Sequence, residues 1–142
     1  DMGVGECAGE VVSLFSMEIS KAESEVFDAQ IALDDGDFQE ADRGAYRSML
    51  MAAKALVRTQ YLDVGDNPDD IVREFVERFV KTELFYDKYA KGKFAQYLIA
   101  RHETGPVRQD KDAVRQLIEE AQLFIEATHA CESRLGQTAP AG

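Results

Sequence analysis

The first part of the chain carries apolar residues at alternating spacings of three and four. They stand at Val12, Phe15, Ile19, Ala22, Val26, Ala29 and Leu33. Because a helix turns once every 3.6 residues, this spacing gathers the apolar side chains on one face. We therefore expect a long amphipathic helix, which should end at the turn "DDGD", where Gly36 can adopt the left-handed backbone that closes helices.

A second helix is predicted directly after this turn. Asp37 suits the N-cap position, and Glu40 follows three residues later, as in a capping box. The apolar face of this helix comprises Phe38, Ala41, Ala45, Met49, Ala52 and Leu56, widened by Tyr46, Leu50, Ala53 and Val57. A helix that is apolar over so wide an arc packs on two sides, which predicts a central position in a bundle.

A third helix is predicted after the break "DVGDNPDD". Asn67 can cap it, Pro68 suits its first position, and Asp69 and Asp70 complement the helix dipole. Its buried side is expected to consist of Ile71, Val72, Phe75, Val76, Phe79 and Val80.

The periodicity weakens between residues 83 and 102. Gly92 predicts a kink or break there, before a helical stretch that runs through Leu98. The segment "ETGPVRQD" is expected to be a loop, and the last helix should begin near Asp110. The apolar positions of this last helix are Val114, Leu117, Ala121, Phe124, Thr128, Cys131 and Leu135.

No segment alternates apolar and polar residues with the period of two that marks strands, so the chain is predicted to be all-α. The expected architecture is an antiparallel bundle of four or five helices. A chain of 142 residues suits one domain. We predict a linker from a larger chain at residues 1–10, the helical bundle at residues 11–135 and a flexible tail at residues 136–142.

Composition narrows the class of protein. An apolar content of 45% and a charged content of 30% are typical of a water-soluble globular domain. The two cysteines, Cys7 and Cys131, lie far apart and predict neither a disulfide framework nor a cysteine-rich zinc site. No apolar run has the length of a membrane span, and acids stand where a signal peptide would carry Lys or Arg. We expect a cytoplasmic protein without a membrane partner.

The net charge of −11 opposes binding to a nucleic-acid backbone. The charge is uneven, however. Residues 81–115 contain eight Lys or Arg and five Asp or Glu, so this stretch is +3 while the rest of the chain is −14. Any anionic partner is therefore expected to dock on this stretch.

The opening stretch "GVGECAGEVV" has three interpretations: a phosphate cradle, a metal or redox site, or a linker. Both common phosphate-binding turns need a strand before the glycines, and no strand is predicted here. A soft-metal site needs several convergent thiolates or imidazoles, and Cys7 has no local companion. The linker is the favoured interpretation.

The tetrapeptide "EATH" places Glu126 and His129 on one helical face, at the spacing that di-iron bundles use for two ligands. Such a centre needs the pair twice and two more inward glutamates. His102, the other histidine, is preceded at that spacing by Ile99, so half the ligand set is missing. We expect no metal, and a surface or interface role for His129.

The segment "LFYDKYAKGKFAQY" interleaves aromatic residues with lysines, as single-strand binders do. The alternatives are an aromatic stripe that faces the core, with lysine stems along its edges, and a protein-docking surface. The docking candidates are Tyr86, Tyr89, Phe94 and Tyr97. The candidates for binding a nucleotide or another anion are Lys88, Lys91, Lys93, Arg101, His102 and Arg108.

Catalytic chemistry is not indicated by the residues. No serine stands in a nucleophile elbow, and only His102 and His129 are ordinary neutral-pH bases. Carboxylates are abundant, but on a helical protein most of them belong to solvated faces. We expect no catalytic residue in this domain.

Residues 29–57, "AQIALDDGDFQEADRGAYRSMLMAAKALV", resemble the first two helices of the HEPN family, which meet around an acidic-glycine turn. The resemblance extends over most of the chain and implies the fold, a tendency to dimerise, and a nucleotide- or partner-binding role. HEPN ribonucleases carry an arginine followed after four to six residues by a histidine. Here Arg101 and His102 are adjacent and no arginine stands at that distance before His129, so ribonuclease activity does not carry over.

The leader "DMGVGECAGE" is similar to the junction near the carboxyl end of bacterial sulfite or nitrite reductases that append a HEPN-like domain. This resemblance implies that the sirohaem and iron–sulfur cluster belong to an upstream part, and that this domain itself holds no cofactor. The expected function is a noncatalytic accessory domain that dimerises, docks a partner or contacts the reductase. The alternative is a HEPN-type module that binds a nucleotide or RNA, and a metal-dependent enzyme using Glu126 and His129 is a third, weaker hypothesis.

Overall fold

The computed structural model describes residues 2–106 and 110–138, with side chains for residues 14–106 and 110–136, and this part of the chain is all-helical. The elements are α1 (Met2–Asp34), α2 (Phe38–Val57), α3 (Pro68–Phe75), a single π-helical turn η1 (Val76–Val80), α4 (Lys93–Thr104) and α5 (Lys111–Thr138). Within those ranges no strand occurs, and one isolated bridge joins Asp87 to Lys91. The predicted all-α class is confirmed.

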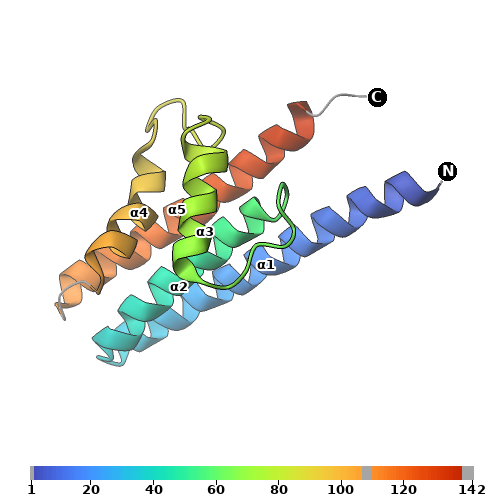
Figure 1. The fold of residues 1–142 in the computed structure, drawn as a ribbon. Helices are drawn as coiled ribbons and strands as arrows, with labels where there is room; N and C mark the ends of the chain where they lie inside the picture. The colour runs from blue at the N-terminus through green and yellow to red at the C-terminus, as the bar shows by residue number, and fades with distance from the viewer. Residues whose placement is uncertain (1, 107–109, 139–142) are drawn as a thin grey trace.

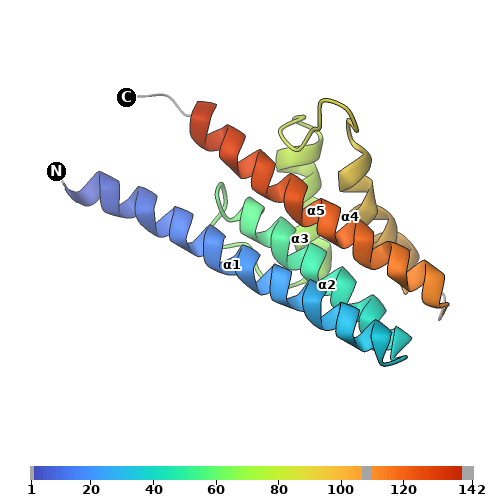
Figure 2. The ribbon, with the colours of Figure 1, turned by 180° about the vertical axis from the view of Figure 1, so that it is seen from behind.

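The three long helices α1, α2 and α5 form one layer, and α3, η1 and α4 form a second layer against it (Figure 1). Seen from behind, the long helices lie in front of α3 and α4 (Figure 2). Helix α1 runs opposite to α2 and α5, so its N-terminal end lies at the same end of the molecule as the C-terminal end of α5. Helix α2 contacts α1, α3, α4 and α5, which confirms its predicted central position.

The caps predicted for α2 and α3 are confirmed. The carboxylate of Asp37 accepts a hydrogen bond from the backbone N–H of Glu40 at 3.2 Å, and Gly36 before it has a φ of +82°. The side-chain oxygen of Asn67 accepts from the backbone N–H of Asp69 at 2.8 Å, with Pro68 at the first helical position. Both caps satisfy amides that a helix start leaves without partners.

The core lies among the three long helices and between the two layers. Helices α1 and α2 approach closely where Gly44 faces Ala29, because a Cβ atom on Gly44 would stand 3.1 Å from that of Ala29. Four phenylalanines from α3, η1, α5 and the segment after η1 pack with ring centroids 5.0 to 6.4 Å apart. They are Phe75, Phe79, Phe85 and Phe124. Aromatic rings in this distance range attract one another as well as burying area.

Element boundaries differ from expectation at several places. Helix α4 continues past Leu98 and includes Glu103 and Thr104, which were expected in a loop; it ends at Gly105, whose φ is +78°. Helix α5 begins at Lys111, as predicted, and extends to Thr138. Residues 136–138 of the predicted tail are therefore helical, since a single glycine such as Gly136 costs only about 1 kcal/mol within a helix, and residues 139–142 lie outside the described part.

The predicted linker at residues 1–10 is helical from Met2 onward, and it continues into α1 without interruption. A glycine inside a helix costs only about 1 kcal/mol relative to alanine, so the three glycines of the leader are tolerated there. Residues 2–10 are thus the first turns of α1, whereas a non-helical glycine hinge was expected. Their role as a connection to a larger chain stays a prediction.

Candidate interaction surfaces

An exposed apolar face lies along α1 beside α5. The side chain of Phe27 is 67% exposed, and that of Ile31, one turn further along α1, is 45% exposed. Phe27 contributes to a groove between the two helices, whose floor includes Val26 and Ile125. The polar residues that line this groove are Glu23, Gln30, Gln122, Glu126 and His129. We call Phe27, Ile31 and this groove the α1–α5 face.

The α1–α5 face is where the structure places Glu126 and His129, the residues of the metal hypothesis. His129 is exposed, with Nε2 3.3 Å from a carboxylate oxygen of Glu23 on α1, and its ring meets that of Phe15 edge-on. Across residues 14–106 and 110–136 no group of three or more His, Cys, Asp or Glu side chains gathers as a metal site would require. These contacts connect α5 to α1, and His129 lies at the surface, one of the two positions expected for it.

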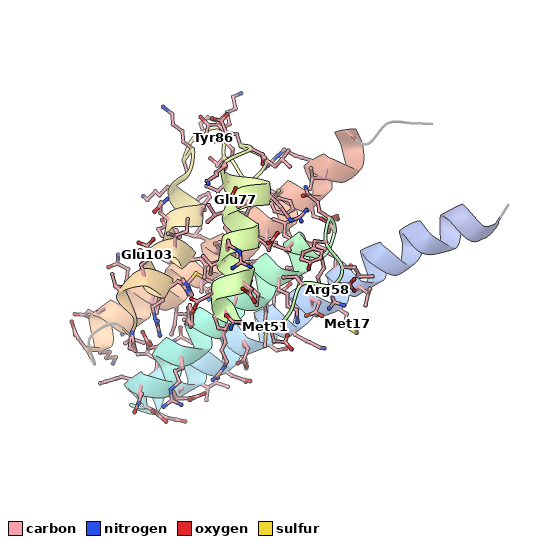
Figure 3. All side chains as sticks on the ribbon, viewed as in Figure 1. Met17, Met51, Arg58, Glu77, Tyr86 and Glu103 are labelled. Carbon is pink, nitrogen blue, oxygen red and sulfur yellow. The ribbon has the colours of Figure 1, made fainter. Side chains whose placement is uncertain are left out.

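A second candidate surface is the segment between η1 and α4, residues 81–92. Figure 3 shows Tyr86 on this segment, at the upper end of the molecule and remote from Met17. Tyr89 is 87% exposed, and the ammonium group of Lys88 lies 5.7 Å from the centre of its ring. Lys91 and Lys93 are also exposed. We call residues 85–93 the basic loop.

The basic loop has a defined conformation. The carboxylate of Asp87 accepts hydrogen bonds from the backbone N–H groups of Ala90 and Tyr89, at 2.6 and 2.8 Å. These two bonds hold the pKa of Asp87 below its ordinary value. Asp87 and Lys91 also exchange two backbone hydrogen bonds, with Lys91 at a φ of +58°.

Helix α5 anchors the segment that leads into the basic loop. The guanidinium of Arg134 donates to the backbone oxygens of Leu84 and Tyr86, at 3.2 and 3.3 Å. The thiol of Cys131 donates to the oxygen of Leu84 at 3.3 Å. The loop and the last turns of α5 are therefore coupled directly.

The aromatic residues of this region divide into a buried and an exposed group. Phe85 is buried in the core, and Phe94 and Tyr97 are partly buried against it. Tyr86 and Tyr89 are exposed. Of the four docking candidates, Phe94 and Tyr97 lie in the first turns of α4 and pack on the bundle.

Arg101 and His102 do not join the lysines. They lie near the far end of α4, about 12 Å along the helix from Lys93 at 1.5 Å per residue. The guanidinium of Arg101 is buried, and it donates to the buried carboxylate of Asp42 at 2.7 Å. It is therefore not placed to bind an anion at the surface. Arg108 lies outside the described residues.

A polar network surrounds this buried ion pair. The guanidinium of Arg101 lies over the ring of Tyr46 at 4.3 Å, and the Tyr46 hydroxyl is 2.7 Å from Nδ1 of His102. Nε2 of His102 is 2.8 Å from the carboxylate of Asp69 at the start of α3. Burial raises the pKa of Tyr46. The network ties α2, α3 and α4 together, which indicates a structural role for His102.

Asp42, Arg134 and Phe27 were not among the residues expected to be functional, and Tyr46 was expected only as part of an apolar helix face. The sequence does indicate an exposed position for Phe27. This residue stands outside the three-four apolar stripe of α1 and must therefore face away from the core that the stripe forms. Asp42 and Tyr46 stand one turn apart on the helix predicted to be central, so a polar pair there was a candidate for a buried network. The contacts of Arg134 could not be predicted from the sequence, since its partners are backbone atoms about fifty residues away.

Comparisons of the chain with models of protein families, with curated proteins and with solved structures found no match. A search of the described helices for one long and apolar enough to cross a membrane also found none.

Proposed function

We propose that the chain is a helical interaction domain that forms a homodimer through its α1–α5 face. The observation that carries this proposal is the exposure of Phe27, at 67%, and of Ile31, at 45%, on one helix face. Large apolar side chains grouped beside a polar-rimmed groove are typical of protein interfaces, where aromatic anchors contribute most of the binding energy.

The rim of the groove favours a second copy of the same chain as the partner. A two-fold interface brings each patch against itself, so the patch must contain both the donors and the acceptors of every hydrogen bond across it. The amides of Gln30 and Gln122 carry both donors and acceptors and satisfy this condition. His129, from the same rim, can donate to a carboxylate such as Glu23 or Glu126 across the interface.

The wider setting of the proposal rests on the two resemblances. The domain would adopt the HEPN-like antiparallel arrangement and be appended to a bacterial sulfite or nitrite reductase, whose upstream part would hold the sirohaem and iron–sulfur cluster. In that setting it would contact the reductase, contain no cofactor of its own and take no part in catalysis. The compartment would be the cytoplasm, where a free thiol such as that of Cys131 stays reduced.

Sedimentation equilibrium tests the dimer. The wild-type chain is expected to show a concentration-dependent dimer, and Phe27→Glu with Ile31→Glu should shift it to monomer, because four charges would be buried without partners. The matched control is Leu62→Glu, since Leu62 is 54% exposed but stands outside α1 and α5. A wild-type chain that stays monomeric at high concentration, or a double variant that still dimerises, would contradict the proposal.

A further inference from the structure

His129 lies beside carboxylates on the α1–α5 face. Its Nε2 is 3.3 Å from a carboxylate oxygen of Glu23 on α1. Glu126 stands three residues before His129 on α5 and lines the same groove. The side chains of His129 and Glu23 are 54% and 58% exposed, so solvent reaches both groups in the single chain.

The other charged groups around His129 do not supply a positive charge to the groove. Glu132 follows three residues later on α5 and is a further carboxylate. Arg134 donates to two backbone oxygens of the segment after η1. On α1, Glu18 forms an ion pair with an arginine of α2, and the ring of Phe15 is uncharged.

The charge of the groove lining depends on His129. Within the part of the chain that the structure describes, no lysine or arginine lines this groove. Histidine side chains ordinarily change charge between about pH 5 and pH 8, whereas glutamates ordinarily do so near about pH 4. With Glu23 and Glu126 ionised, the lining therefore carries −2 when His129 is neutral and −1 when it is protonated.

A two-fold dimer through the α1–α5 face brings two such linings against each other. Coulomb repulsion scales with the product of the facing charges, and this product falls fourfold when both histidines take up a proton. Closing the interface also displaces water from the rim, which strengthens the interactions between the charges that remain. Protonation of His129 thus relieves a repulsion that dimerisation itself creates.

We propose that the dimer responds to pH, and that protonation of His129 strengthens it as the pH falls from about 8 to about 6. This response rests on the proposed dimer. The protonated histidine is favoured in the dimer, so dimerisation takes up protons. The extra stability is complete below the pH at which the histidine titrates in the single chain. It is lost as the pH rises through the higher range in which the histidine titrates in the dimer.

Sedimentation equilibrium at about pH 6, 7 and 8, at constant ionic strength, tests the response. The dissociation constant of the wild-type dimer is expected to rise roughly 2-fold to 30-fold from the lowest to the highest pH, because two ion pairs of modest strength are lost per dimer. His129→Gln keeps an uncharged donor and acceptor at every pH. Its dissociation constant should therefore stay near the wild-type value at the highest pH.

The matched control is His129→Gln with Gln60→His. It moves the histidine to an exposed position outside α1 and α5, so the chain keeps the number of titrating groups but should lose the response. Glu23→Gln with Glu126→Gln makes the lining neutral at the highest pH and positive at the lowest. This variant should strengthen the dimer at the highest pH and remove or reverse the response. Circular dichroism at each pH checks that every variant keeps its helices.

The possible results separate the role of His129 from the dimer itself. A wild-type dimer whose dissociation constant is unchanged, or falls, as the pH rises would overturn this role and leave the dimer intact. A response that persists in His129→Gln, or in the variant with Gln60→His, would do the same. If the wild-type chain forms no dimer at any of the three pH values, both the dimer and the role of His129 are overturned.

Discussion

At the scale of single residues, the buried pair of Asp42 and Arg101 is the most consequential contact between α2 and α4. Both charged groups are buried, and the distance between Nη2 and Oδ2 is 2.7 Å. Removing one partner of such a pair leaves an uncompensated charge away from water. We expect Asp42→Ala to lower the free energy of unfolding by about 3–5 kcal/mol, as measured by urea denaturation followed by circular dichroism.

The control for this prediction is Asp28→Ala, which removes an exposed carboxylate from α1. It should change stability by less than about 0.5 kcal/mol. The double variant Asp42→Ala with Arg101→Met removes both charges and should be more stable than Asp42→Ala alone. If Asp42→Ala is no less stable than Asp28→Ala, the buried pair contributes nothing to the fold.

The thiol of Cys131 provides a second prediction at this scale. Burial raises its pKa to about 11 from an ordinary value of 9.0, and the nearby Arg134 opposes this shift. Because the native state favours the neutral thiol, the resulting stabilisation is complete below pH 9 and is lost as the pH rises through about 11. In a Cys7→Ser background, alkylation by iodoacetamide at neutral pH should be far slower in the native protein than in guanidinium. Equal rates would show that Cys131 is accessible.

Residue-level features were predictable from the sequence when their partners are near in the chain. The caps at Asp37 and Asn67 depend on amides two or three residues away, so local patterns indicate them. The Arg101–Asp42 pair joins residues 59 positions apart, and only packing of α4 on α2 brings them together. For this reason Arg101 was expected at an anion-binding surface and was found in the interior.

At the scale of elements, the seam between α1 and α2 depends on small residues. A Cβ on Gly44 would meet the Cβ of Ala29 at 3.1 Å and the backbone oxygen of Glu25 at 3.6 Å. Gly44→Leu should therefore force the helices apart and lower the free energy of unfolding by about 1–3 kcal/mol, although leucine favours helices. Thermal denaturation measures this loss.

Gly136 in α5 serves as the matched control, because a Cβ there meets nothing within 4 Å. Gly136→Leu should leave stability unchanged or raise it by up to about 1 kcal/mol, through helix propensity alone. Equal losses in both variants would mean that the seam is not tightly packed.

The helices themselves were largely predictable. Each buries one face, so its apolar residues recur in the sequence with the helical period. The break expected at Gly92 is confirmed, because α4 begins directly after it, but the conformation of residues 81–92 was not predicted. The segment between η1 and α4 is held in part by contacts with residues far away in the chain, which no local sequence pattern predicts. Examples are the contacts of Arg134 and Cys131 with Leu84. The π-helical turn of η1 was likewise hidden, since its residues Val76 and Phe79 fit an ordinary α-helical face.

At the scale of the whole molecule, the net charge opposes the proposed dimer. Two copies of a chain of net charge −11 repel one another, and added ions screen this repulsion. Raising sodium chloride from about 0.05 M to about 0.5 M should therefore strengthen the dimer. Sedimentation equilibrium under both conditions measures this trend. A dimer that weakens as salt is added would contradict an interface held by the apolar side chains of the α1–α5 face.

The position of the basic loop at one margin of the molecule makes the domain an electrostatic dipole (Figure 3). The basic loop contains three Lys and one Asp and is therefore +2, while the remainder of the chain is −13. Near a negatively charged surface, the electrostatic field would rotate the molecule before contact, so that the basic loop faces that surface. The molecule would thus approach an acidic surface with the basic loop first. Approach through the acidic rest of the molecule would be opposed by electrostatic repulsion.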